Sequence, residues 1–199
     1  MSTQGLSATE AFQVRQKITM MVNRYEVQAE GPAGGEGPLL AFAQQKRMAF
    51  KEEVTFYTDE SRSVPIFSFK ARQRIDLGAT YDVLDAEGRS IGSFRKDFGK
   101  SLLRSTWHLT TPTVQAVGQE RSLPAALLRR VWELIPFISA IPCPVLFHFD
   151  FTDETGRVVL SSLRRRSLRD RYEVKVPGGL VDGRVAAAMA VALDALQGR

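Results

Sequence analysis

Apolar and polar residues alternate one by one over many short stretches of this chain. In such a stretch successive side chains point to opposite faces, which is the pattern of a half-buried β-strand. In residues 64–71, for example, Phe67 and Phe69 share one face while Ser68 and Lys70 share the other. The pattern and the turn residues between the stretches predict about twelve strands. These lie at residues 16–21, 24–29, 39–46, 52–58, 64–71, 79–84, 90–96, 104–110, 113–119, 144–152, 157–164 and 170–176.

The end of the chain has a different pattern, because every residue from 185 to 193 is apolar. A helix that is apolar all round has no face for water and must be buried. The apolar part would span only ~18 Å, at about 1.5 Å per residue, which is too short to cross a bilayer. Residues 184–197 therefore predict a buried core helix, and we expect no transmembrane segment. A second, short helix is predicted at 122–136, with Ser122 as its cap and Pro124 in its first turn.

Two of the predicted hairpins resemble each other. Residues 81–93 and 149–161 align at a constant offset of 68. In each hairpin a glycine follows an aspartate by three positions, where a tight turn favours a residue that adopts positive φ at little cost. The chain is therefore predicted to contain two similar strand-rich halves with the short helix between them. The recurring residues are Asp82, Asp85, Gly88 and Arg89 in the first half and Asp150, Asp153, Gly156 and Arg157 in the second.

These elements predict a mostly β fold. A sheet that curls around the all-apolar helix would bury that helix, and closure into a barrel would remove exposed sheet edges. We therefore expect a closed barrel of about twelve strands around the buried C-terminal helix. Residues 16–199 are predicted to form this single domain, and residues 1–15 are predicted to be a flexible leader.

Two features carry a resemblance to a known family. They are the repeated D-x-x-G hairpins and the run D-R-Y-E-V-K-V-P at 170–177, which precedes A-A-A-M-A-V-A-L-D at 186–194. From about residue 16 onward the chain resembles the LURP-one-related proteins and the phospholipid scramblases of the tubby C-terminal-like superfamily. The resemblance implies a twelve-stranded barrel around a central hydrophobic helix. Tubby domains bind phosphoinositides, and scramblases are associated with moving phospholipids in response to calcium.

The sequence gives little support for a metal or a cofactor. Calcium needs several oxygen ligands, mostly carboxylates. The segment that resembles the scramblase calcium loop offers Asp170 and Asp182, but Leu168, Gly178 and Gly179 stand where acidic residues are expected. With two His and one Cys in the whole chain, a zinc site is also disfavoured. We expect no metal site and no cofactor.

Positive charge is the feature that points to a partner. The net charge is +5, and anionic lipid head groups attract basic residues near a membrane surface by ~1 kcal/mol each. Binding of nucleic acid is disfavoured, because no aromatic residue for base stacking lies between residues 164 and 171. We predict a lipid head-group site formed by basic residues in corresponding parts of the two halves. These are Arg164, Arg165, Arg166, Arg169, Arg171 and Lys175 in the second half and Arg95, Lys96 and Lys100 in the first.

Alternatives to lipid binding remain open. The basic loops could be solvated tips of a protein-interaction or structural module, and scramblase-like or enzymatic activity is a third hypothesis. For catalysis, His148 and Asp150 share a strand face, but there is no G-x-S-x-G nucleophile motif. The single Cys143 and the lack of a signal-peptide pattern predict a cytoplasmic protein. A peripheral position at the inner membrane face would follow from lipid binding.

Overall fold

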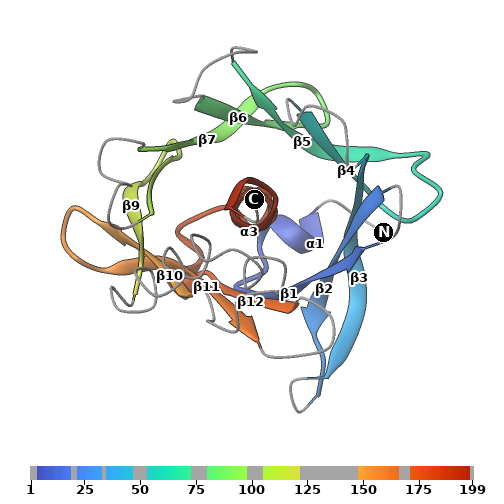
Figure 1. Ribbon diagram of the computed structural model, residues 1–199, viewed down its shortest axis with the longest axis horizontal. Helices are drawn as coiled ribbons and strands as arrows, with labels where there is room; N and C mark the ends of the chain where they lie inside the picture. Colours follow the sequence, from blue (N-terminus) through green and yellow to red (C-terminus); the bar gives the residue numbers. More distant parts are fainter. Residues whose placement is uncertain are drawn as a thin grey trace, which may run out of the picture.

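A closed antiparallel barrel of twelve strands surrounds one helix in the computed structural model, as the sequence predicts (Figure 1). The structure describes residues 4–18, 22–32, 35–46, 53–72, 80–97, 105–121, 148–165 and 171–197. Consecutive strands pair around the wall, and β12 closes the barrel against β1. The strands are β1 (Ala11–Ile18), β2 (Val22–Glu30), β3 (Glu36–Lys46), β4 (Glu53–Tyr57), β5 (Pro65–Ala71), β6 (Thr80–Asp85), β7 (Ser90–Lys96), β8 (Thr106–Thr110), β9 (Gln115–Glu120), β10 (His148–Asp153), β11 (Val158–Arg165) and β12 (Arg171–Lys175).

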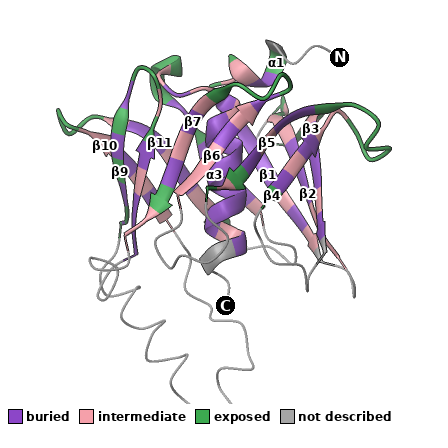
Figure 2. Cartoon of the chain, turned by 90° about the horizontal axis from the view of Figure 1, so that it is seen from above, coloured by how far each residue is buried: buried purple, intermediate pink, exposed green. Residues whose placement is uncertain are grey.

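Helix α3 (Gly183–Gln197) fills the barrel (Figure 2). Its side chains from Val185 to Leu193 are at most 5% exposed, which confirms the predicted core helix. The alanines of α3 leave room for large side chains that point inward from the wall, because every second residue of a strand faces the interior. These side chains bury the apolar surface that stabilises the fold. The largest of them include Trp107, Tyr25, Phe12, Phe56, Phe67, Phe69, Phe94, Phe149 and Phe151.

One glycine of the wall leaves room for a large side chain of the neighbouring strand. Gly118 of β9 faces the interior, and a Cβ at this position would lie 2.3 Å from Cε1 of Phe151. Real Cβ atoms do not come so near, so the Phe151 ring occupies the space that a side chain would need. The glycine is therefore required by packing rather than by its backbone conformation.

The N-terminal boundary differs from the prediction. Strand β1 begins at Ala11, so the predicted boundary at residue 16 lies inside a strand, and residues Gln4–Ser7 form the short helix α1. Leu6 of α1 is 3% exposed and belongs to the core. The break predicted between the strands at 16–21 and 24–29 is wrong at Asn23, which lies in β2 and pairs with Ile18. Before residue 16, Phe12 and Val14 already alternate with polar residues. Gln16 interrupts this apolar alternation, because it faces inward and donates to the hydroxyl of Tyr25.

The two predicted hairpins are built alike. Gly88 and Gly156 have φ of 80° and 82°, and each amide donates to the carbonyl of the aspartate three residues earlier. The carboxylates of Asp85 and Asp153 then accept from the amides of Arg89 and Arg157. Both hairpins also carry a register shift at corresponding positions of β6 and β10. The predicted short helix at 122–136 and the predicted strand start at 144–147 lie outside the described residues.

The antiparallel topology gives the barrel two distinct ends. Helix α3 begins next to Gly92, near the start of β7, and its last turn reaches Tyr25 and Tyr172. All odd-numbered strands therefore end where α3 ends, and we call this end of the barrel the C-terminal rim. The turns at residues 58–64, 86–89 and 154–157 lie at the opposite end.

Candidate functional site

The C-terminal rim brings together most of the described members of the predicted basic set. Arg95 and Lys96 end β7, Arg164 and Arg165 end β11, and Arg171 begins β12. Lys175 is the exception. It lies at the other end of β12, four residues from Arg171, which corresponds to about 13 Å along a strand. The structure thus separates Lys175 from the others, and Lys100, Arg166 and Arg169 lie outside the described residues.

Cross-strand register decides which of these cations face outward. Directly opposite residues of an antiparallel pair lie on the same face of the sheet. Arg164 is opposite Tyr172 and therefore lies on the inner face at the barrel mouth.

Lys96 also faces inward, because it is opposite Trp107, and its Nζ lies 5.9 Å from the Trp107 ring centroid. Three cations lie on the outer face. Arg95 is opposite His108, and Arg165 and Arg171 are opposite each other. The outer face of the rim therefore presents three of the predicted cations.

These three cations do not converge on one pocket. Strands β8, β9 and β10 separate β7 from β11 in the wall, so Arg95 is four strand spacings, about 19 Å, from Arg165. Figure 1 shows β7 and β11 on different sides of the barrel. Arg165 and Arg171, by contrast, are direct neighbours on adjacent strands. The rim is therefore a broad basic border with one local concentration at β11 and β12.

Carboxylates neutralise part of this border. The Arg165 guanidinium donates to both oxygens of Glu173, with nitrogen–oxygen distances of 2.8 Å. Hydrogen bonding and the negative charge of Glu173 raise the pKa of Arg165, which favours the charged guanidinium of this ion pair. Arg171 has no ion pair with any residue in the described ranges.

Two further rim arginines were missed by the sequence analysis. Arg72 follows β5 and donates to both oxygens of Asp82, at 2.8 and 2.7 Å. Arg121 follows β9 and holds Asp150 in the same way, at 2.7 and 2.9 Å. The residues sit 49 positions apart, not 68, so the hairpin repeat does not reveal them. Their position directly after an odd-numbered strand is the signal that could have found them.

His148 and Asp150 share the outer face of β10, as predicted, but the carboxylate is already engaged. Besides Arg121, Asp150 accepts from the Ser161 hydroxyl at 2.9 Å. Burial works against ionisation of Asp150, but the hydrogen bonds from Arg121 and Ser161 outweigh it and hold its pKa below the usual value. Burial, together with the charge of Arg121, lowers the pKa of His148. This is the arrangement of a structural ion pair beside a neutral histidine.

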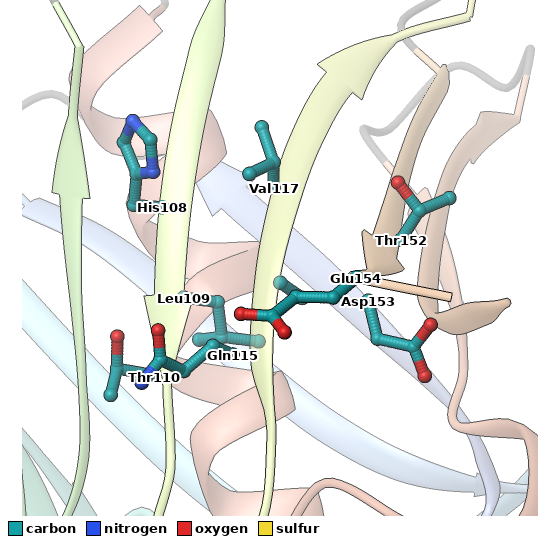
Figure 3. Close-up of a pocket in the computed structure, with 9 residues that line it drawn as sticks. His108, Leu109, Thr110, Gln115, Val117, Thr152, Asp153 and Glu154 are labelled. Atoms are coloured by element: carbon teal, nitrogen blue, oxygen red, sulfur yellow. The ribbon is translucent and has the colours of Figure 1, made fainter. Parts of the chain in front are cut away.

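The outer wall also contains a shallow recess of about 210 Å³ between β8, β9 and β10 (Figure 3). His108, Val117 and Thr152 line it from neighbouring strands, and His108 Nε2 lies 3.1 Å from Asp97 Oδ2. Glu154 points toward Gln115 across the recess (Figure 3). The volume is below the ~300 Å³ at which small-molecule sites usually begin.

The described residues contain no group of three or more His, Cys, Asp or Glu placed to hold a metal ion. Asp182, one of the two carboxylates considered for calcium, is held by the guanidinium of Arg184 at 2.7 Å, and Asp170 lies outside the described residues. Within the described parts of the chain, no helix is both long enough and apolar enough to span a bilayer.

Comparison with known proteins supports the predicted family over part of the chain. The sequence model of the LURP-one-related family matches residues 40–134, a little under half of the chain. This confirms the resemblance for that stretch, which contains strands β4 to β9 and most of β3. Placement in the wider tubby C-terminal-like superfamily, together with the scramblases, stays a prediction.

The other two comparisons add no argument. No curated protein matches the sequence. Among solved structures, a porin-like protein from Bacteroides uniformis ATCC 8492 aligns over 85% of this chain and 96% of its own, with 9% identity and a TM-score of 0.25. At that TM-score the likeness carries no conclusion about fold or function.

Proposed function

We propose that the whole chain is a non-catalytic barrel of the LURP-one-related, tubby-like type that docks reversibly on anionic phospholipid membranes through its C-terminal rim. The docking would take place at the cytoplasmic face of a membrane. One observation carries the proposal. Three cations, Arg95 of β7, Arg165 of β11 and Arg171 of β12, lie on the outer face at the same end of the barrel.

The geometry favours a surface over a single head group. Cations about 19 Å apart on a rim can each meet a different lipid, at ~1 kcal/mol per basic residue near an anionic surface. Three such contacts give weak, reversible docking. They also predict a strong salt dependence, because exposed charges are screened within about 8 Å at physiological ionic strength.

The exposed apolar surface does not favour a protein-interaction module instead. Val64 and Val117 are the large apolar side chains that the described residues expose, at 53% and 37%. Val64 precedes β5 and Val117 lies in β9, so several strands of the wall separate them. Single exposed apolar side chains are normal on a protein surface, whereas an interaction site usually shows a continuous patch.

Vesicle flotation tests the proposal. Wild-type protein is mixed with neutral vesicles or with vesicles containing phosphatidylserine or phosphoinositides, at low and at physiological salt. We expect flotation with anionic vesicles alone and a loss of binding as salt rises. The variant R95E/R171E removes about 2 kcal/mol of attraction and adds repulsion, so its binding should fall more than tenfold.

A matched variant controls for net charge. Lys175 and Arg62 are exposed, lie at the opposite end of the barrel and form no ion pair within the described chain. The variant K175E/R62E therefore has the same net charge as R95E/R171E and should bind nearly as wild type. Equal loss in both variants, or no binding of wild type to any anionic vesicle, would overturn the proposal.

A further inference from the structure

Three arginines form a row across the outer face of β11, β12 and β1. Arg171 is directly opposite Arg165 on one side and directly opposite Arg15 on the other. The register is fixed by the closure of the barrel, in which β12 lies between β11 and β1. Facing residues have Cβ atoms about 5 Å apart, so the three side chains are immediate neighbours.

Like charges in facing positions repel, and the row needs anions to stabilise it. The arginine at each end of the row forms an ion pair with a glutamate. Arg165 is bound by Glu173, and Arg15 is bound by Glu36. Arg171, in the middle, has no ion-pair partner in the part of the chain that the structure describes. Within the described residues, two carboxylates thus form ion pairs with the three guanidinium groups, because Glu26, which faces Arg15, is bound by Lys17. The guanidinium group without such a pair is at the centre of the row.

Position and geometry both suit a phosphate. Arg171 is the first residue of β12, at the C-terminal rim, whereas Glu173 lies two residues, or about 7 Å, farther from the rim. A guanidinium group binds phosphate oxygens through two parallel hydrogen bonds, and facing arginines can share one phosphate.

We propose that the Arg15, Arg171 and Arg165 row is a binding site for a phosphate group, with Arg171 as its main contact, and that Glu173 limits its affinity by holding Arg165. The inference rests on the proposed function, in which the phosphate belongs to a phospholipid head group. A phosphate bound at Arg171 would supply an anion to the one guanidinium group of the row that has no ion pair among the described residues. Glu173 competes with it for the Arg165 guanidinium.

The test compares two arginines of the same rim. Arg171 belongs to the row, whereas Arg95 is a rim cation that faces His108. R171Q and R95Q change the net charge equally. On phosphatidic acid vesicles we expect R95Q to lose about fivefold in partition coefficient, as ~1 kcal/mol implies, and R171Q to lose more than twentyfold. The phosphate of phosphatidic acid is a terminal monoester, whereas that of phosphatidylserine is a singly charged diester covered by the serine group. On phosphatidylserine vesicles of equal surface charge, the two losses should therefore be similar.

Two matched variants, E173Q and E53Q, test the role of Glu173. Glu53 also lies at the C-terminal rim, at the start of β4, and its ion pair with Lys70 is loose, at 3.9 Å. E173Q and E53Q each remove one negative charge. We expect E173Q to raise binding to phosphatidic acid vesicles about fivefold, whereas E53Q should raise it by less than twofold. In the double variant E173Q/R165Q, the increase caused by E173Q should be lost. A gain that survives in E173Q/R165Q would show that Arg165 does not carry it and would overturn the role of Glu173.

The outcomes separate this inference from the proposed function. If wild type binds anionic vesicles but R171Q and R95Q lose equally, the phosphate site is wrong and docking on anionic membranes stands. If wild type binds no vesicle, docking is wrong, and inorganic phosphate then tests the site alone. Stabilisation of wild type but not of R171Q by millimolar phosphate would assign the row to a soluble phosphate, and stabilisation of neither would reject the site.

Discussion

Replacing Asp194 with alanine tests how α3 is fixed inside the barrel. Asp194 lies in the last turn of α3 and accepts hydrogen bonds from two wall tyrosines, Tyr25 of β2 at 3.0 Å and Tyr172 of β12. Tyr25 is fully buried and Tyr172 is 5% exposed. In D194A both hydroxyl protons lose this acceptor at a half-buried position, and the Tyr25 oxygen keeps the hydrogen bond from Gln16.

The magnitude follows from two opposing effects. A buried hydroxyl that loses its acceptor costs about 1–3 kcal/mol, so two of them cost about 2–6 kcal/mol. The substitution also favours the helix, because alanine has a higher helix propensity than aspartate and a negative charge near a helix C-terminus is unfavourable. Together these helix effects return about 1–1.5 kcal/mol. We therefore expect D194A to lower the free energy of unfolding by about 0.5–5 kcal/mol.

Urea unfolding, followed by tryptophan fluorescence to which the buried Trp107 contributes, measures this difference. D194N keeps an oxygen acceptor and should lose less than D194A. Y25F/Y172F removes both donors, so that adding D194A to this background should change stability little. An unchanged or increased stability of D194A would refute the reasoning, since the helix terms alone predict a more stable protein.

Two further predictions concern the same core. G118A should lower the free energy of unfolding by about 1–3 kcal/mol, because its Cβ would meet the Phe151 ring, whereas G5A, with no atom within 4 Å of its Cβ, should not destabilise the protein. Burial, followed by the charge of Asp194, raises the pKa of Tyr25 above its ordinary value of 10. The folded state then favours the protonated phenol, so its contribution to the free energy of unfolding is complete below pH 10. Above pH 10 this contribution falls by up to about 1.4 kcal/mol per pH unit. In Y25F this part of the decrease in stability with rising pH should be absent.

The strands were predictable because the alternation of apolar and polar residues depends only on neighbouring positions in the sequence. Alternation in residues 64–71 and the Asp-x-x-Gly turns need no knowledge of distant residues, and both were confirmed. The extent of β1 was not predicted, because the apolar alternation of Phe12 and Val14 is interrupted at Gln16, a polar residue at an inward position stabilised by a hydrogen bond to Tyr25. A pattern of apolar and polar letters cannot distinguish such a residue from one that faces water.

The rim was only partly predictable, because it depends on the register between distant segments. Lys175 is close to Arg171 in sequence, yet the extended strand carries it toward the other end of the barrel. Arg15 is far from Arg171 in sequence, yet the closing pair of strands makes them neighbours. The sequence therefore identified the cations of the second half as a group without showing which of them meet.

Amide hydrogen exchange with and without anionic vesicles tests most directly that the C-terminal rim meets the membrane. We predict that bound vesicles slow exchange in peptides containing the ends of β7 and β11 and the start of β12. Exchange in the turns at 86–89 and 154–157, at the opposite end, should be unchanged. Protection of those turns, or equal protection at both ends of the barrel, would contradict the account.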